Sequence, residues 1–420
     1  VYGPASYFVD LLHFLDTQGD VNDTVRYKKV LDVLFERRKD LGKIKLNCPN
    51  TETPMPYIDL INEILESAVV NEPDFSCQTT RTAEELKVSP ENIKSKAYET
   101  LKSAVYPFDL PFDLWSVQAD AYLEKIGYQR HQIMRTLQSE EGQSDVEIAA
   151  EHLGLTPLDL KIITGKNVDD RDIYDFCGLN EKNFDSMKNG NNLSLLLRQT
   201  GLSYEEFSRL LNARFVDPRG DIQIIFCEGA DCNLDKARVK TLPGSLPDKF
   251  FDSLHRFVRL NSKLGWKVGE LDRALSTFSV TKPDDLNEST IKNLSFLKQL
   301  CTDLSQPVDE CLTWWSDKID TIGDEGGPST YECVFLDKAQ NTETLRLNDK
   351  LDELKIIKNA SHKIKDHETE LLGPLRISSK DLKLLYEADE ELNLSSLSML
   401  YRNISLSRAL GLSINEFLSL

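Results

Sequence analysis

The sequence predicts a mainly α-helical protein, an irregular stack of many helices with at most short β-hairpins in insertions. Three observations support this prediction: repeated helix-start signals, apolar residues spaced with the period of a helix, and a scarcity of residues that break helices. Of the 420 residues, only 16 are proline and 20 are glycine. Most of the chain is therefore free to be helical.

Helix starts are marked by a local unit that occurs four times. An apolar residue precedes a Ser or Thr, and an acid stands three positions after the hydroxyl residue, followed by a second apolar residue; the units are 155–160, 202–207, 377–382 and 412–417. The hydroxyl accepts the backbone N–H of the third helical residue, the acid accepts the N–H of the hydroxyl residue, and the apolar pair packs together. Asn180 repeats the cap without the acid. These units predict where five helices begin.

Glycines mark the ends of the preceding helices. Gly154, Gly201 and Gly411 each stand two positions before the hydroxyl residue of one of these starts. A glycine past a helix end, followed by a capping residue, is typical of one helix stopping and the next beginning. The spacing between starts is irregular, which argues against a solenoid of fixed period.

Between these signals the apolar residues recur with helical period, for example over residues 57–65 and 254–271. At the usual helix length we expect roughly 15–20 helices. Strand signals are sparse. Residues 222–226 and 331–335 are the candidates for short edge strands or hairpins, and both lie in segments flanked by Gly or Pro.

The longest stretch without helical periodicity is 217–247, and we place a soft domain boundary there. It divides an N-terminal helical lobe, residues 1–216, from a second helical lobe, residues 217–420. The chain begins with Val1 rather than Met and stops at Leu420 inside a helix-like pattern. We therefore expect it to be a piece of a larger protein.

The chain is strongly acidic, with 69 acidic and 50 basic residues and a formal net charge of −19. Such a surface repels phosphate backbones and anionic lipid, which argues against nucleic acid as a partner. Solubility alone also accounts for the charge. No run of about 20 apolar residues is present, so we expect no direct membrane insertion by this segment. No signal peptide is visible.

We predict no catalytic, cofactor-binding or metal site, and no enzyme activity. The sequence motifs of nucleophilic hydrolases, phosphate-binding loops, dinucleotide folds and zinc peptidases are missing. The nearest approach to a metal motif is Cys227 with Cys232, which lacks a second pair at zinc-finger spacing. A loop disulfide or two unreactive thiols are the alternatives there. We expect most of the eight cysteines to be reduced and buried, and the six histidines to be polar members of helix faces.

Several segments resemble one protein family, in order along the chain. Residues 47–66 resemble an Asn/Thr/Pro-rich turn leading into a helix near the N-terminus of Tc toxin A components and of the related Salmonella virulence-plasmid A protein. Residues 3–16 resemble the family's opening helix, and residues 31–41 resemble its next step, with Lys39 where Pro is usual. Further matches are Tyr106–Asp113, Ile163–Gly165, Asn212–Pro218, Leu254–Leu260 and Leu264–Leu275. The motifs are structural rather than catalytic.

This resemblance implies the α-helical shell of a pore-forming Tc toxin A subunit, part of an insecticidal toxin complex. In that family the A subunits form a homo-pentamer whose shell protects a translocation channel until a pH change opens it. A B–C cocoon then delivers a toxic enzyme into the host cell. The implied partners are the remainder of the A subunit, identical subunits, the B–C cocoon through the parent protein, and indirectly the host cell surface. The resemblance implies no cofactor, and a secreted, extracellular virulence protein.

Two other functions stay open at this point. A stand-alone protein of the virulence-plasmid A type would act as a host-interaction module without a pore. An enzyme with a dispersed active site would show a deep polar pocket with convergent acids or histidines. The charge of −19 also leads to the hypothesis that contacts between subunits depend on pH, because carboxyl groups that are packed together change their pKa values.

Overall fold

The structure is a computed structural model of the chain. It describes residues 3–17, 21–23, 26–37, 41–43, 45, 57–71, 81–138, 144–166, 168, 171–189, 193–226, 234–241, 244–323, 327–336, 345–355, 363–387 and 389–420.

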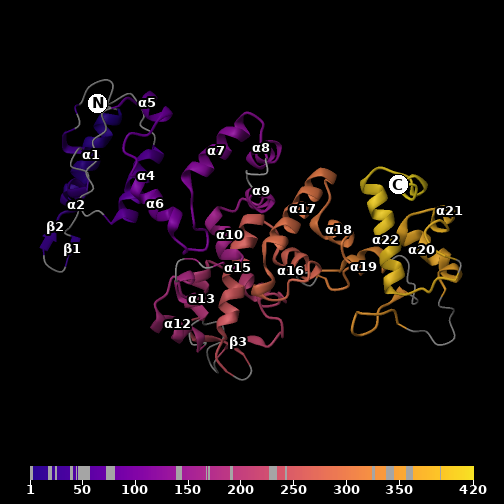
Figure 1. The fold of residues 1–420 in the computed structure, drawn as a ribbon. Coiled ribbons are helices and arrows are strands. Elements are labelled where there is room, and N and C mark those ends of the chain that lie inside the picture. The colour runs from indigo at the N-terminus through magenta and orange to yellow at the C-terminus, as the bar shows by residue number, and fades with distance from the viewer. Residues whose placement is uncertain are drawn as a thin grey trace. The chain divides into compact units, whose positions relative to one another are not determined.

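The prediction of a mainly α-helical protein is confirmed (Figure 1). The described residues contain 22 α-helices, more than expected, because several are only four to eight residues long. The helices of the N-terminal quarter are α1 (Pro4–Thr17), α2 (Val30–Arg37), α4 (Tyr57–Val70), α5 (Ala83–Val88) and α6 (Ser95–Ser103). Those that follow, up to residue 210, are α7 (Leu114–Lys125), α8 (Arg130–Thr136), α9 (Asp145–His152), α10 (Pro157–Ile163), α11 (Ile173–Phe176), α12 (Glu181–Lys188), α13 (Leu193–Thr200) and α14 (Tyr204–Leu210).

The remaining helices are α15 (Asp248–Leu264), α16 (Val268–Thr277), α17 (Glu288–Leu304), α18 (Val308–Thr313), α19 (Thr330–Phe335), α20 (Glu368–Leu375), α21 (Ser379–Leu382), α22 (Leu394–Ala409) and α23 (Ile414–Phe417). Short 3₁₀ turns are η1 (Leu41–Lys43), η2 (Leu234–Lys236), η3 (Pro283–Asp285) and η5 (Ile364–His367). No described helix combines the length and the apolar composition needed to cross a bilayer.

The predicted helix starts are confirmed. Thr156, Ser203 and Ser413 each form a complete capping box with the acid three residues later. Ser378 accepts the N–H of Asp381 and also donates its hydroxyl to the Asp381 carboxylate. Asn180 caps α12 as expected. Gly154, Gly201 and Gly411 all have φ between 68° and 75°, the left-handed conformation that ends a helix.

The strand predicted at 331–335 is wrong, because these residues lie in helix α19. Ser329 and Glu332 form a capping box there: the Ser329 N–H lies 2.8 Å from the Glu332 carboxylate, and the Glu332 N–H lies 3.2 Å from the Ser329 Oγ. Tyr331 and Phe335, four residues apart, are both fully buried on one helix face. The alternating apolar pattern of this short run fits a helix face as well as a strand.

The strand predicted at 222–226 is confirmed as β3 (Ile222–Phe226). It pairs in antiparallel fashion with β4 (Ala237–Thr241), with Ile224 opposite Val239. Val239 is buried, and Ile224 packs against the same core. A second two-stranded sheet joins β1 (Val21–Asp23) to β2 (Arg26–Lys28), and the sequence reading did not predict it.

The chain forms two compact units. Val1–Ala104 with Pro111–Val117 make up the first, and Val105–Leu110 with Gln118–Leu420 make up the second. The lobe boundary predicted within 217–247 is a different division and stays a prediction.

The second unit contains two hydrophobic cores. The first is arranged around the long helix α15, and the predicted face over 254–271 points into it: Leu254, Phe257, Leu260 and Leu271 are at most 1% exposed. The second core lies under helices α19, α20 and α22. Its fully buried members include Tyr331, Phe335, Leu371, Leu397, Leu400 and Ile404.

In the first unit, α4 is a helix as predicted, but its apolar face lies on the surface. Tyr57 is 75% exposed, and Ile58, Ile64 and Leu65 are each more than half exposed. The opposite, acidic face packs on the neighbouring segment: Glu66 accepts the backbone N–H of Lys94 at 2.7 Å and the hydroxyl of Tyr98 at 2.5 Å, and Glu63 accepts an amide N–H of Asn92. These hydrogen bonds determine which side of α4 faces inward.

One fully buried cation joins the start of the second unit to its central helix. Arg259 of α15 donates to the carbonyl oxygens of Val105, Phe108 and Leu110, and its guanidinium lies 5.1 Å from the centroid of the Phe108 ring. Burial lowers the pKa of Arg259 to about 10, so the side chain is still protonated at neutral pH. A single side chain thus holds the segment Val105–Leu110 against α15.

The same segment depends on a close backbone approach at Gly178. A Cβ atom built there would lie 2.2 Å from the Tyr106 ring, and the φ of Gly178 is 64°. Only glycine satisfies both conditions. The Tyr106 hydroxyl also donates to Gln199 of α13, so that three distant parts of the sequence meet at this ring.

We expect Arg259→Met to lower the free energy of unfolding by at least about 3 kcal/mol. Three carbonyl oxygens would lose their donor together, and each buried unsatisfied polar group costs about 1–3 kcal/mol. Urea unfolding followed by circular dichroism measures the change. Arg219→Met is the matched control, since Arg219 is exposed. Equal unfolding midpoints for the two variants would contradict the role assigned to Arg259.

Candidate functional site

The segments that resemble the toxin family meet one another in the structure. Arg256 of α15 donates to the carbonyl oxygens of Ile163 and Pro283, at 3.4 and 3.3 Å, and forms a double contact with the Asp252 carboxylate. Its guanidinium occupies the space beside Gly165, where a Cβ atom would clash. These motif residues are therefore packing contacts between helices.

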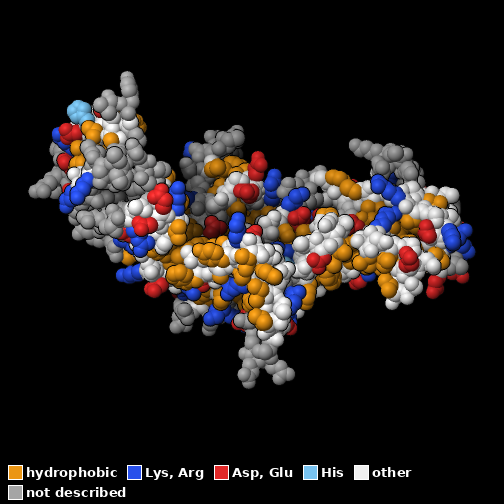
Figure 2. Space-filling model, turned by 90° about the horizontal axis from the view of Figure 1, so that it is seen from above, with side chains coloured by type: hydrophobic (Ala, Val, Ile, Leu, Met, Phe, Trp, Pro, Cys, Tyr) orange, Lys and Arg blue, Asp and Glu red, His pale blue; other side chains and the backbone are white. Residues whose placement is uncertain are grey.

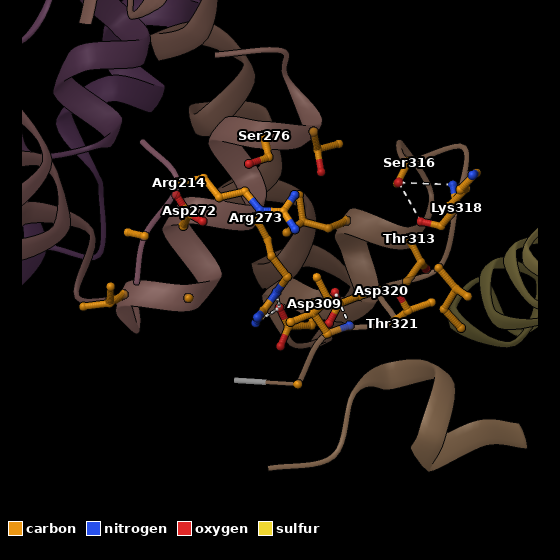
Figure 3. A pocket seen from close by; sticks show the side chains of 18 of the residues that line it. Arg214, Asp272, Arg273, Ser276, Asp309, Thr313, Ser316, Lys318, Asp320 and Thr321 are labelled. Carbon is orange, nitrogen blue, oxygen red and sulfur yellow. Dashed lines mark hydrogen bonds and ion pairs between the residues drawn. The ribbon is translucent and has the colours of Figure 1, made fainter. Parts of the chain in front are cut away.

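A cavity lies in the second unit between α14, α16, α18 and the loop that follows α18 (Figure 3). Its volume is about 620 Å³. Arg273 of α16 spans it to Asp309 of α18: its Nε and Nη2 atoms lie 2.9 and 2.6 Å from the same Oδ1. Its lining also contains the charged side chains of Arg209, Arg214, Asp272, Lys318 and Asp320.

Each acid of this cavity takes part in a contact within the protein. Asp272 accepts the backbone N–H of Phe215 at 2.9 Å, and Asp320 accepts that of Ile322 at 3.3 Å. Burial raises the pKa of both carboxyl groups, in opposition to the lowering effect of these hydrogen bonds and of the nearby arginines. The polar lining therefore connects α16 to α18 and to the turn that follows α14, and it combines both signs of charge with several hydroxyl groups.

No group of three or more potential metal ligands occurs among the described residues. Cys227 and Cys232, the nearest approach to a metal motif in the sequence, lie outside the described residues, and so does His362. The two alternatives for these thiols, a loop disulfide or two unreactive thiols, therefore stay predictions.

A pair of histidines was missed by the sequence reading. His131 of α8 and His152 of α9 lie with ring centroids 4.3 Å apart, and His152 Nδ1 is 2.8 Å from the Ser295 hydroxyl of α17. The Lys298 ammonium donates to the His152 carbonyl oxygen. The two histidines are 21 positions apart in the sequence and on different helices, so only the packing of α8 on α9 reveals the pair.

The environment of this pair favours neutral rings. Burial lowers the pKa of His152 to about 4, and the neighbouring His131 and Lys298 charges act in the same direction. Burial is also the main cause of the lowered pKa of His131, with smaller effects from Arg135 and Lys298. Both rings are therefore uncharged at neutral pH, as polar members of packed helix faces.

The architecture defines a class of protein: a stack of mostly short helices, many with their own capping boxes, arranged over successive hydrophobic cores. Neither a protein-family model nor a curated protein sequence matches the chain. Among solved structures, the chain is similar to the cryo-EM structure of Morganella morganii TcdA4, with a TM-score of 0.59 and 14% sequence identity. The alignment covers 98% of this chain and 22% of that one. The chain thus has a fold of the Tc toxin A type and spans about a fifth of the length of TcdA4.

We expect acid to destabilise the protein through His152. Its pKa falls from about 6.5 in the unfolded chain to about 4 in the folded protein, so the unfolded state takes up the proton first as the pH drops. Stability is complete above pH 6.5 and is lost as the pH falls from 6.5 towards 4. His152→Asn keeps a polar group near Ser295 and removes this proton uptake.

The measurement is the free energy of unfolding at several pH values between 7 and 4. We expect the wild-type protein to lose about 1 kcal/mol more than His152→Asn across this window, less than the full pKa shift would give, because the half-buried ring is partly screened by solvent. His13→Asn serves as the control because His13 is exposed on α1. Parallel pH profiles for the wild-type protein and His152→Asn would refute the effect.

Proposed function

We propose that the chain is a non-enzymatic structural part of a pore-forming Tc toxin A subunit. In this role the chain forms part of the α-helical shell that protects the translocation channel and supports delivery of a toxic enzyme into host cells. The observation behind the proposal is the match of nearly the whole chain, 98%, to 22% of TcdA4. The resemblance of the sequence motifs to Tc toxin A components points in the same direction.

The buried polar groups of the chain favour a structural role over a catalytic one. The acids of the 620 Å³ cavity each make a contact within the protein, through Arg273 or through a backbone N–H group. The motif residues Arg256 and Arg259 hold neighbouring segments through backbone carbonyls. We therefore propose that these polar groups hold the helices of the stack rigidly together.

Exposed apolar helix faces support the proposal that further protein covers parts of this chain. The α4 side chains Tyr57, Ile58, Ile64 and Leu65 form one such face. On α1, Tyr7, Leu11 and Phe14 follow helical spacing and are at least 40% exposed, and α7 exposes Trp115 and Tyr122. Apolar side chains also reach the surface over much of the face in Figure 2. Clusters of this kind mark interaction surfaces in soluble proteins.

We propose the remainder of the A subunit as the occupant of the α4 face, since 78% of TcdA4 lies outside the alignment (100 − 22). In the parent protein the further partners would be identical subunits of a homo-pentamer and, through them, the B–C cocoon. Host cells would be reached indirectly, from an extracellular, secreted particle. Nucleic acid and direct membrane insertion have no place in this proposal.

The parent protein that contains this chain tests the proposal by electron microscopy at neutral pH and after a pH jump. A five-fold particle that encloses a channel within a helical wall, and that opens after the jump, is the expected result. A small monomer that is indifferent to pH would overturn the shell assignment. That outcome would favour the stand-alone virulence-plasmid A type, a host-interaction module without a pore.

The α4 face gives a sharper test in the same parent protein. We expect the double variant Ile64→Glu/Leu65→Glu to prevent assembly of the particle, because two buried charges without partners oppose docking. The isolated chain should keep its thermal midpoint, since substitutions at exposed positions usually change stability by less than about 0.5 kcal/mol.

Val88→Glu is the matched control. Val88 is 86% exposed at the end of α5 in the same unit, and its replacement is also from apolar to acidic. We expect this variant to assemble normally. If the α4 variant also assembles in normal yield, the remainder of the A subunit does not cover this face.

A further inference from the structure

Two cysteines face each other across the helical hairpin formed by α17 and α18. Cys301 is the fourth residue from the end of α17, and Cys311 is the fourth residue of α18. The connection is Ser305, in the left-handed conformation with φ 51°, followed by Gln306 and Pro307. Residues at equal distances from a tight connection between two helices lie side by side.

Backbone hydrogen bonds at the end of α17 and at the start of α18 hold the two cysteines in these positions. The Gln306 N–H donates to the Cys301 carbonyl oxygen at 3.0 Å, and the Cys311 N–H donates to the Pro307 carbonyl oxygen at 3.1 Å. Cys311 belongs to the first core, and Cys301 packs against that core from the neighbouring helix. Both residues are free thiols.

The two thiols differ in the way that an exchange reaction requires. Cys311 is fully buried in the first core, whereas Cys301 is partly accessible at its edge. A hydrogen bond with the Cys311 side chain lowers the pKa of Cys301, against the effects of its partial burial and of Glu270 and Asp309. The same hydrogen bond, together with burial, raises the pKa of Cys311. Cys301 is therefore the thiol that ionises first and meets a reagent from solvent.

Two other cysteines show the contrast. Cys177 is buried in the first core, and burial raises its pKa to about 12. Cys333 is exposed on α19. Burial leaves the first unreactive, and the second serves as a reference for an accessible thiol.

We propose that Cys301 and Cys311 form a redox-active dithiol that locks α18 to α17 by a disulfide. The Cys301 thiolate attacks one sulfur of a small-molecule disulfide and releases one thiolate from it. Cys311 then loses its proton and attacks the Cys301 sulfur, which releases the second thiolate. Two protein thiols are oxidised, one external disulfide is reduced to two thiols, and one protein disulfide forms.

The position of α18 gives this lock a consequence for the two cores. Arg273 of α16 pairs with Asp309 of α18, and the Tyr401 hydroxyl of α22 donates to the Glu310 carboxylate of α18 at 2.7 Å. Just after α18, Trp314 donates its indole N–H to Ser405 of α22. Helix α18 therefore connects the first core to the second, and the disulfide would fix this connection.

The whole chain can be tested with oxidised glutathione followed by alkylation, tryptic digestion and mass spectrometry. The tryptic peptide Gln299–Lys318 contains both cysteines and no other, because Lys298 and Lys318 are the nearest cleavage sites. The expected result is a peptide that has lost two hydrogens and takes up no alkylating label. A glutathione adduct on Cys301 alone, or two free thiols that both take up label, would overturn the proposal.

A stability measurement distinguishes a native lock from a bridge made in unfolded protein. We expect oxidation to raise the thermal midpoint of the native protein by a few degrees, because a closed loop restricts the unfolded chain. Cys301→Ser should abolish this shift, and Cys333→Ser should keep it. If Cys301→Ser does not fold, the wild-type peptide map still decides the question. A bridge that forms only in denaturant counts against the proposal, which does not depend on the proposed shell function.

Discussion

The second unit depends on a buried positive charge, the guanidinium of Arg259, which donates its hydrogen bonds to backbone carbonyl oxygens. Arg259 satisfies three backbone carbonyl oxygens of a segment about 150 positions earlier in the chain. A buried cation is tolerated only where its donors find partners, so the segment Val105–Leu110 and α15 must be in place together. Gly178 and Gln199 add the further condition that the Tyr106 ring fits between them. Arg259 and Tyr106 together therefore bring the segment Val105–Leu110, Gly178, α13 and α15 into contact.

The helical class and the helix starts were predictable because their causes are local. A capping box needs only residues three apart, and Ser203 with Glu206 or Ser413 with Glu416 can be read directly. The strand prediction at 331–335 is wrong for an equally local reason: Ser329 and Glu332 form a capping box that starts a helix, whereas the alternating apolar residues favour a strand. The outward apolar face of α4, the His131–His152 pair and the cavity could not be predicted, because each depends on which helices become neighbours.

The family-like motifs have a physical explanation in this structure. Arg256 and Gly165 belong to two separate motifs and touch each other, and Phe215 of a third motif donates its N–H to Asp272 of a fourth. Such residues are constrained by close packing and by buried hydrogen bonds, whatever the chain binds. This is why the motifs predicted the fold well and gave no information about a ligand.

Self-contained helix ends have a consequence for how such a chain can acquire new parts. At Gly154, Gly201 and Gly411 one helix is closed by a left-handed residue, and the next is opened by its own capping box two residues later. The Leu155 and Leu412 N–H groups, directly after the glycines, still donate to the preceding helices, at Ala150 and Ser407. Extra sequence placed after these leucines and before the capping residues would therefore break no backbone hydrogen bond of either helix. Closing a longer loop adds only about 0.6 kcal/mol for each doubling of its length. Junctions of this kind are sites where whole domains can be inserted during evolution without loss of the underlying stack.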